Sequence, residues 1–395
     1  MAHLCPRYPQ RAMFLAAARG RARVRRMSAA RAALAVPEPH RGGATTRSED
    51  ARRENVDVAT ASNNVVPFRR KLPETVPDAP PASAEEVNIA APAISPRERS
   101  IEPSLPSVRA LASFITAAER LLVITGAGCS TESAIPDYRS PKGAYSTGFK
   151  PMTHQDFLRA DGNRKRYWAR SFVGWKKFAE GTSPNRAHVA LAALQREGHV
   201  WRLITQNVDR LHHAAGSEDA LELHGTTHEV ICLNCDDVTP RTRMQRRLIE
   251  LNPTFLGSTL RDAEDVVKRQ NPDGDVELDG GVEKTFKLPT CLKCGTGTLK
   301  PKVVFFGDCV PAKDASVAKA WSERADAVLV VGSSVSTFSA YKLVKEAVTR
   351  GAPVAILTNG DTRVDDVADL KVRAVAGETL SRILDVVRRE ETYGY

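Results

Sequence analysis

The sequence predicts an α/β fold, a doubly wound, Rossmann-like parallel sheet with a smaller zinc-binding and helical domain. Short apolar runs alternate with helical patterns along residues 104–390. Most of these runs end in small or polar residues, as strands do at the ligand-binding edge of a parallel sheet. Two Cys-x-x-Cys pairs interrupt the alternation and indicate a separate metal-binding element.

The first run, from Leu121 to Thr125, is apolar and β-branched, which is typical of a buried parallel strand. Gly126 and Gly128 follow at once, and glycines there let backbone N–H groups approach a phosphate closely. A tight turn without a ligand explains these glycines equally well. Thr131 replaces the third glycine of the usual dinucleotide fingerprint, and no Gly-Lys-Ser/Thr of a P-loop follows.

Helical patterns separate the apolar runs. One begins near Ser107 and leads into the first strand, and another covers residues 156–178 with an aromatic block at 166–175. A third begins at Pro184 and Asn185 with alanines and leucines on one face. Residues 140–150 form a polar, glycine-containing loop of the kind that closes over a ligand.

Polar residues follow several later strands. The run at 200–205 ends at Gln206, Asn207 and Asp209, and Leu221–Leu223 leads to His224. We also expect strands at 303–308, 327–331, 353–357 and 372–375. Because the carboxyl ends of parallel strands meet at one edge of a sheet, residues 206–224 form a candidate site. A lone histidine such as His224 is more often structural than catalytic.

Charge and hydropathy narrow the function classes. The chain of 395 residues has a net charge of +10, but residues 1–100 alone hold 17 Lys and Arg against 10 Asp and Glu. The folded part is therefore nearly balanced, and direct nucleic-acid binding becomes a minor hypothesis. No apolar run approaches the roughly 20 residues of a membrane helix, so we expect no membrane partner.

The N-terminal segment has a targeting composition. Residues 1–37 contain eight arginines and no Asp or Glu, which resembles an organellar presequence. A disordered basic tail and a wrongly assigned start codon are the alternatives. Residues 38–103, rich in Pro, Ala, Ser, Glu and Arg, predict a disordered linker.

The two Cys-x-x-Cys pairs are Cys232 with Cys235 and Cys291 with Cys294. Thiolates at i and i+3 on a tight turn share one tetrahedral ion, and two such pairs complete a structural four-cysteine zinc site. A redox pair and a nucleic-acid-reading zinc finger are the alternatives. Neither a thioredoxin-like context nor a histidine pair supports them.

Together these stretches resemble the sirtuin family of NAD-dependent protein deacylases. The resemblance rests on Gly-Ala-Gly-Cys-Ser at 126–130, Ile-Pro-Asp-Tyr-Arg at 135–139, Thr-Gln-Asn-Val-Asp-Arg-Leu-His at 205–212 and His-Gly at 224–225. The block at 166–175 is similar to class II sirtuins, the mitochondrial sirtuin-four-type proteins. Ala134 stands where the family usually has glycine, and Thr358 where it has an asparagine for the adenosine ribose.

The resemblance implies a site for NAD and an acyl-lysine substrate. The acyl oxygen of a modified lysine attacks the ribose carbon as nicotinamide leaves, and His224, with Asn207 and Asp209, is catalytic. Tyr167, Arg170, Val304, Phe306 and Gly307 contact the substrate. The implied cofactor-binding residues are Gly126, Ala127, Gly128, Ser130, Thr131, Pro136, Asp137, Tyr138, Arg139, Gln206, Asn207, Asp209, Gly332, Ser333, Ser334, Thr358, Asn359, Gly360 and Ala376.

Further expectations concern specificity and organisation. The Tyr-x-x-Arg spacing of Tyr167 and Arg170 resembles sirtuins that grip an acidic acyl chain, so we expect larger or acidic acyl groups, or lipoyl-lysine, to outrank acetyl. The alternative is that Arg170 lies on a solvated helix face and Tyr167 packs in the core. We expect a monomer in the mitochondrial matrix, or in the cytoplasm if residues 1–37 are no presequence. The Rossmann-like part comprises 104–139, 186–225 and 303–390, and the small domain 140–185 and 226–302. A mono-ADP-ribosyltransferase, a nicotinamide dehydrogenase and a non-catalytic NAD-binding module are the alternative functions.

Overall fold

The computed structural model describes residues 102–255, 269–278 and 281–393. These belong to one compact unit of the chain. The presequence predicted at 1–37 and the linker predicted at 38–103, except for its last two residues, lie outside the described residues.

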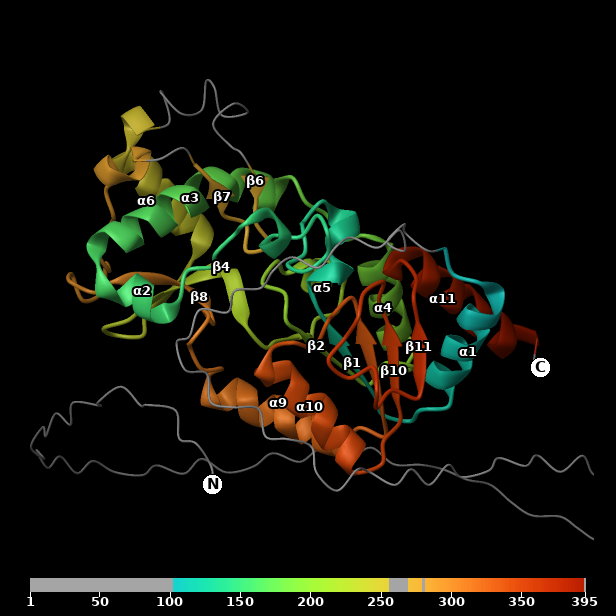
Figure 1. Cartoon of the computed structure of the whole chain (residues 1–395). Coiled ribbons are helices and arrows are strands. Elements are labelled where there is room, and N and C mark those ends of the chain that lie inside the picture. The colour runs from blue at the N-terminus through green and yellow to red at the C-terminus, as the bar shows by residue number, and fades with distance from the viewer. Residues whose placement is uncertain (1–101, 256–268, 279–280, 394–395) are drawn as a thin grey trace, which may run out of the picture. The chain divides into compact units, whose positions relative to one another are not determined.

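Six parallel strands form the main sheet in the order β11-β10-β9-β1-β2-β3. The chain builds β1, β2 and β3 toward one edge and β9, β10 and β11 toward the other (Figure 1). The doubly wound sheet is therefore confirmed, and its change of direction lies between β1 and β9. The strands are β1 (Leu121–Thr125), β2 (Arg202–Thr205), β3 (Leu221–Glu222), β9 (Ala327–Val331), β10 (Val354–Leu357) and β11 (Leu370–Val372).

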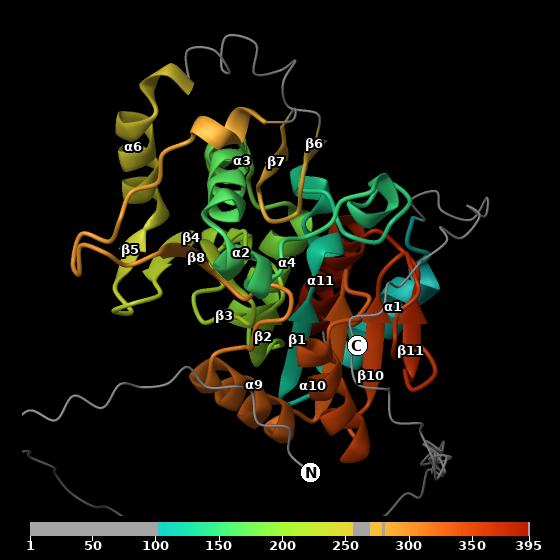
Figure 2. The same ribbon diagram turned by 60° about the vertical axis from the view of Figure 1, so that its left-hand side comes forward.

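Helices cover both faces of this sheet (Figure 2). In β1, Leu121 and Val123 pack toward α1 (Leu105–Thr116), α4 (Arg186–Arg196) and α11 (Ala376–Tyr393). Leu122 and Ile124 pack on the opposite face toward α9 (Ala312–Arg324) and α10 (Phe338–Thr349). Alternate side chains of a strand point to opposite faces, so a wholly apolar run fits a strand covered on both sides.

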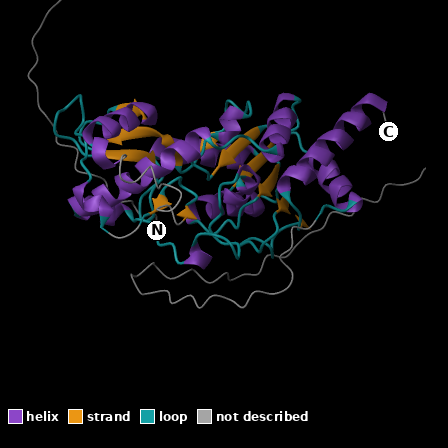
Figure 3. Cartoon of the chain, turned by 90° about the horizontal axis from the view of Figure 1, so that it is seen from above, coloured by secondary structure: helices purple, strands orange, loops and turns teal. Residues whose placement is uncertain are grey.

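A second group of elements surrounds the predicted zinc pairs. A three-stranded antiparallel sheet, ordered β5-β4-β8, packs with α2, α3 and α6 round an aromatic core. Seen from above, the strands fall into two groups, each flanked by helices (Figure 3). The elements are α2 (His154–Arg159), α3 (Asp161–Glu180), β4 (Gly225–Cys232), β5 (Val238–Pro240), α6 (Arg241–Leu251), β6 (Arg269–Gln270), β7 (Val276–Glu277) and β8 (Leu299–Val303).

Short helices lie in the connecting loops. They are η1 (Ala127–Cys129), η2 (Thr131–Ser133), η3 (Tyr145–Thr147), α5 (Leu211–Ala214) and η4 (Val282–Thr285). None of the described helices is long and apolar enough to cross a membrane.

Two predicted elements differ in kind from the structure, and the strand predicted at 372–375 is shifted to Leu370–Val372. The strand predicted at 303–308 is wrong: β8 ends at Val303 and pairs with β4 in the small sheet. Val303 and Phe305 pack into the aromatic core, because an apolar run specifies burial but not which core receives it. The single helix predicted at 156–178 is two helices, separated by the extended residue Ala160.

Candidate active site and zinc centre

The loop after β1 lies against the loop after β9. Gly126 N donates to Val331 O at 3.1 Å and Gly128 N to Gly332 O at 2.8 Å. A Cβ at Gly126 would lie 2.7 Å from Ser333 Cβ, and one at Gly128 2.8 Å from Gly332 O. Both glycines are thus required by the contact between two strand-end loops, whether or not a ligand also approaches them.

The next turn explains the departure at Ala134. This residue has φ 62° and ψ 20°, in the left-handed region that favours glycine. For an L-residue other than glycine this conformation costs about 1–2 kcal/mol. The alanine therefore adopts the backbone conformation of a glycine position, at a cost in stability.

Several of the predicted cofactor residues at 131–139 organise their own loop. Thr131 Oγ1 donates to Gly128 O at 3.0 Å, and Asp137 Oδ1 accepts from Arg139 N at 3.1 Å. The Tyr138 ring lies 6.5 Å, centroid to centroid, from the ring of Phe306. The loop predicted to bind cofactor therefore meets the segment predicted to bind substrate.

A buried polar network joins the ends of β1 and β2. Ser130 Oγ donates to Asp209 Oδ2 at 2.7 Å, and Asn207 Nδ2 donates to Ser130 Oγ at 2.9 Å and to Gly126 O at 3.1 Å. Burial raises the pKa of the Asp209 carboxyl. The structure thus brings together residues from two motifs that are far apart in the sequence, Ser130 from one and Asn207 and Asp209 from the other.

Gln206 connects this network to the loop after β9. Its Nε2 donates to Ser333 Oγ at 2.7 Å, and its Oε1 accepts from Thr337 Oγ1 at 3.0 Å. Ser333 Oγ also accepts from Val335 N, and Val335 has φ 52°, which is a strained conformation for a β-branched residue. Such strain persists where surrounding contacts fix the backbone, and it clusters at functional sites.

His224 lies between two hydrogen-bonding partners. Its Nδ1 is 3.1 Å from Gln206 O, and its Nε2 is 2.8 Å from Ser339 Oγ. Because a carbonyl only accepts, Nδ1 carries the proton and Nε2 has a free electron pair in the neutral ring. Burial lowers the pKa of His224, so the neutral form dominates at pH 7. The ring is thus in the protonation state and tautomer of a general base acting through Nε2.

The segment predicted to bind peptide is a loop beside α2. Phe306 forms an isolated parallel bridge with Thr153, and its carbonyl accepts from His154 N at 2.9 Å. Val304 N donates to His224 O at 2.8 Å, which places this loop next to the histidine. The Phe306 side chain is 41% exposed. An exposed aromatic ring on the loop that contacts the candidate base is a suitable surface for an apolar lysine stem.

Tyr167 and Arg170 lie on α3. Tyr167 is buried, and its ring packs 5.7 Å from that of Phe157 and 5.3 Å from that of Phe305. Arg170 Nε donates to Val276 O at 2.9 Å and lies 3.1 Å from Asp275 Oδ2. The guanidinium therefore already has an acidic partner, Asp275, which the sequence did not suggest.

Four further predicted cofactor residues lie after β10 and β11: Thr358, Asn359, Gly360 and Ala376. Thr358 N donates to Val372 O at 3.1 Å, while Asn359 O accepts from Arg373 at 3.1 Å. Ala376 is buried at the start of α11, where Gly377 N donates to Glu132 Oε1 at 3.1 Å. These positions extend the same sheet edge beyond β9.

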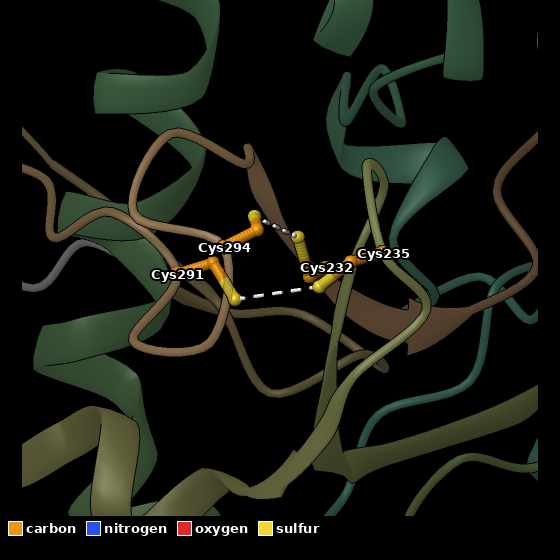
Figure 4. A group of neighbouring side chains, drawn as sticks. All are labelled: Cys232, Cys235, Cys291 and Cys294. Carbon is orange, nitrogen blue, oxygen red and sulfur yellow. Dashed lines mark hydrogen bonds between the residues drawn. The ribbon is translucent and has the colours of Figure 1, made fainter.

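The four cysteines of the two pairs come together (Figure 4). Cys232 Sγ is 3.7 Å from Cys294 Sγ, and Cys235 Sγ is 3.7 Å from Cys291 Sγ. Two thiolates each about 2.3 Å from a tetrahedral ion lie about 3.8 Å apart, so the group fits one structural zinc ion. A Cβ at Gly297 would lie 2.1 Å from Cys232 Sγ, so a glycine is needed beside the cluster.

A second group, Cys129, His188 and His212, is also close together and buried. His188 Nδ1 accepts from Asn185 N at 3.2 Å, so in the neutral ring Nε2 carries the proton and faces Ser130 Oγ at 3.4 Å. To bind a metal, His188 Nε2 would need a free electron pair, and in this tautomer the nitrogen carries a proton instead. His188 therefore supports the Ser130 network rather than a second metal centre.

The site's geometry agrees with comparisons to known proteins. The Sir2 family model matches residues 126–339, which begin directly after β1 and include the Gln206–Asp209 loop, His224, the four cysteines and the start of α10. The chain belongs to the Sir2 family. All the catalytic and metal residues suggested by the sequence lie within the matched range.

Relatives extend the match beyond that range. The chain is 46% identical over 292 residues to the NAD-dependent protein deacylase SRT2 of Arabidopsis thaliana, covering 72% of this chain and 78% of the relative. It is 44% identical over 305 residues to the mitochondrial NAD-dependent protein lipoamidase sirtuin-4 of Homo sapiens, covering 77% and 92%.

Solved structures give the same result. A Sir2 homologue mutant complexed with ADP-ribose is 28% identical with a TM-score of 0.56, covering 72% of this chain and 98% of that one. A Sir2 mutant with a deacetylated p53 peptide and 3′-O-acetyl-ADP-ribose is 26% identical with a TM-score of 0.56, covering 71% and 98%.

Two functional hydroxyl groups were missed by the sequence reasoning. Thr337 binds the side chain of Gln206, and Ser339 binds His224. Both flank the start of α10, where hydroxyl residues are common as helix caps, so their presence carried no distinct signal.

Proposed function

We propose that this chain is an NAD-dependent protein-lysine deacylase that releases nicotinamide and O-acyl-ADP-ribose. The observation that carries the proposal is the neutral His224, with Nε2 unprotonated, beside the Gln206–Asp209 loop at the sheet edge. Family membership supports it. NAD, as the second substrate, supplies the ribose carbon that the acyl oxygen attacks when nicotinamide leaves.

In this proposal the chain's residues divide the work. Ser130, Asn207 and Asp209 form a rigid buried floor, since each is hydrogen-bonded to another. His224 Nε2 accepts the proton of a ribose hydroxyl, and Gln206 O stabilises the resulting imidazolium through Nδ1–H. The loop from Val304 to Gly307 carries the acyl-lysine substrate, with Phe306 against its stem.

The test is nicotinamide release with an acyl-lysine peptide, measured for the wild type, His224→Ala and His199→Ala. We expect His224→Ala to lower the rate by about 10²–10⁴-fold, the usual cost of losing a general base. His199 precedes β2, at the amino end of the parallel strands, whereas His224 lies at their carboxyl end, so His199→Ala serves as the matched control. Formation of NADH instead of nicotinamide would identify a dehydrogenase, and near-normal turnover by His224→Ala would contradict the assigned role.

For the acyl group we propose a preference for larger or acidic chains, or lipoyl-lysine, over acetyl. Tyr167 and Arg170 are three residues apart on α3, so they project from one helix face. Both lie near the acidic turn between β6 and β7. Arg170 contacts Asp275, and the pKa of Tyr167 is raised first by burial and then by Asp273 and Asp275. The human and bovine relatives named lipoamidase are consistent with a long acyl chain.

We further propose import into the mitochondrial matrix. Residues 1–37 supply the eight arginines and lack acidic residues, and two relatives are mitochondrial by name. A fluorescent fusion carrying residues 1–100 is expected to enter mitochondria and lose its arginine-rich head. Cytosolic or nuclear fluorescence would contradict this location.

A further inference from the structure

Ser339 makes the shorter of the two hydrogen bonds to the imidazole ring of the candidate base. It is the second residue of α10, and its Oγ lies 2.8 Å from His224 Nε2. The Nδ1 atom of the ring donates to Gln206 O, so Nε2 is an acceptor, and the serine hydroxyl donates its hydrogen to it. The imidazole is thus held from both sides.

The start of α10 also hydrogen-bonds Gln206, the residue that contacts the other nitrogen of the ring. Thr337, the N-cap of α10, donates to Gln206 Oε1 at 3.0 Å, while the Gln206 carbonyl accepts from His224. One turn of helix therefore fixes His224 directly through Ser339 and indirectly through Thr337. Ser336, in the preceding loop, is exposed and bonds only Ser334 Oγ, at 2.9 Å, among the described residues.

We propose that Ser339 is a positioning residue that fixes the ring orientation and the Nδ1–H tautomer of His224 in the cofactor-free protein, ready for a substrate hydroxyl. Nε2 has a single electron pair, so it accepts from one donor at a time. The serine hydroxyl occupies that position until a ribose hydroxyl replaces it. The inference rests on the proposed function only in naming the ribose as the replacement.

A hydrogen bond to the neutral form of a histidine lowers its pKa, because protonation must break it. The bond from Ser339 therefore adds to the effect of burial on His224. The charged groups of the surrounding elements are engaged elsewhere or exposed: Asp209 with Ser130, Glu222 with Arg210, Lys302 with Glu229, and Lys342 in solvent. Ser339 is then the adjacent group whose removal changes the titration of this ring.

The experiment is an NMR titration of the His224 ring in the full-length chain, with the signal assigned by its loss in His224→Asn. Removing a hydrogen bond worth about 0.5–1.5 kcal/mol predicts that Ser339→Ala raises the pKa by about 0.4–1.1 units. Ser339→Thr keeps the hydroxyl and is expected to retain the wild-type pKa. Ser336→Ala is the matched control and is expected to cause no shift.

Kinetics give an independent readout. The acidic limb of the kcat/KM pH profile reports the pKa of the base in the free enzyme, and the acidic limb of the kcat profile reports its pKa in the enzyme–substrate complex. We expect Ser339→Ala to raise the apparent pKa of the kcat/KM limb and to leave that of the kcat limb unchanged, because in the complex the substrate has already displaced the serine. An unchanged ring pKa in Ser339→Ala, or the same shift in Ser339→Thr, overturns the inference. A ring that titrates as expected in a chain without deacylase activity would refute the proposed function and leave this inference standing.

Discussion

Replacing Asp275 by asparagine is expected to strengthen the proposed preference for acidic acyl chains. Asp275 Oδ2 lies 3.1 Å from Arg170 Nε, and both side chains are largely buried, at 7% and 19% exposure. A carboxylate at the end of an acyl chain must compete with Asp275 for that guanidinium. The wild-type protein therefore gains less from an acidic substrate than the Tyr-x-x-Arg spacing alone implies.

The magnitude follows from one charge-assisted hydrogen bond. Such a bond contributes about 1.5–3 kcal/mol, which corresponds to roughly 10- to 150-fold in preference. Burial, and then Asp273, raise the pKa of the Asp275 carboxyl well above its usual range. Two adjacent buried carboxyls do not both ionise readily, so the pair balances about one charge of Arg170. Asp275→Asn removes the carboxyl that contacts Arg170 but leaves Asp273 to carry the shared charge, so an acidic substrate is expected to regain part of the 10- to 150-fold.

The assay compares kcat/KM for glutaryl- and acetyl-lysine peptides in four proteins: wild type, Asp275→Asn, Arg170→Met and the double variant. The glutaryl-to-acetyl ratio is expected to rise in Asp275→Asn and to fall in both proteins that carry Arg170→Met. Glu277→Gln is the matched control, because Glu277 lies on the same hairpin but pairs with Arg269 at 3.3 Å. A ratio that rises equally in the double variant would show that Arg170 does not bind the acyl end.

Three further predictions concern stability and metal content. Cys232→Ser is expected to lose the single zinc ion and to melt the small domain, whereas Cys129→Ser keeps one zinc per chain; metal analysis and thermal unfolding check this. Ala134→Gly is expected to raise the free energy of unfolding by about 0.5–1 kcal/mol, since relief of the left-handed conformation exceeds the added chain entropy. Ala144→Gly, at φ −58°, is its control and is expected to destabilise in the same urea titration. Glu222→Gln tests a pH effect, because burial raises the pKa of Glu222 from 4.5 to about 7. Between these two pH values the folded protein keeps a proton on Glu222 that the unfolded chain has lost. The stability that this proton contributes is therefore lost as the pH rises from about 4.5 through 7. The fall in melting temperature of the wild type between pH 5 and 8 is expected to be smaller in Glu222→Gln, and an equal fall would contradict it.

The sheet was predictable because strand burial and strand-end chemistry both appear in the sequence. Leu121–Ile124 is apolar at every position, and the structure buries these four residues between two helical layers. The run from Val303 to Phe306 is also apolar at every position, yet Val303 and Phe305 pack in the small domain and Phe306 is exposed. Composition predicts that such a run is buried, but its partner strands depend on contacts far away in the chain.

The site was predictable to a similar extent. Polar residues after β1 and β2 signal a ligand edge, and the structure joins Ser130 to Asp209 across 79 positions of sequence. Asp275 is beyond the reach of such reasoning, because Arg170 and Val276 are 106 positions apart and lie in elements with no shared motif. Side-chain partners that are far apart in the sequence and share no motif need the fold first, whereas strand-end motifs need only the order of the strands.

Gln206 explains why these motifs act together. Its backbone N donates to Thr125 O at 3.0 Å, and its side chain forms hydrogen bonds with Ser333 and Thr337. Its backbone carbonyl accepts a hydrogen bond from His224 Nδ1. One residue therefore touches the end of β1, the loop after β9, the start of α10 and the candidate base. Because the link to His224 uses the carbonyl, it depends on the backbone position at the end of β2 and not on the glutamine side chain. The parallel sheet fixes that position, which is how a fold made of local strands and helices sets the protonation state of a single histidine.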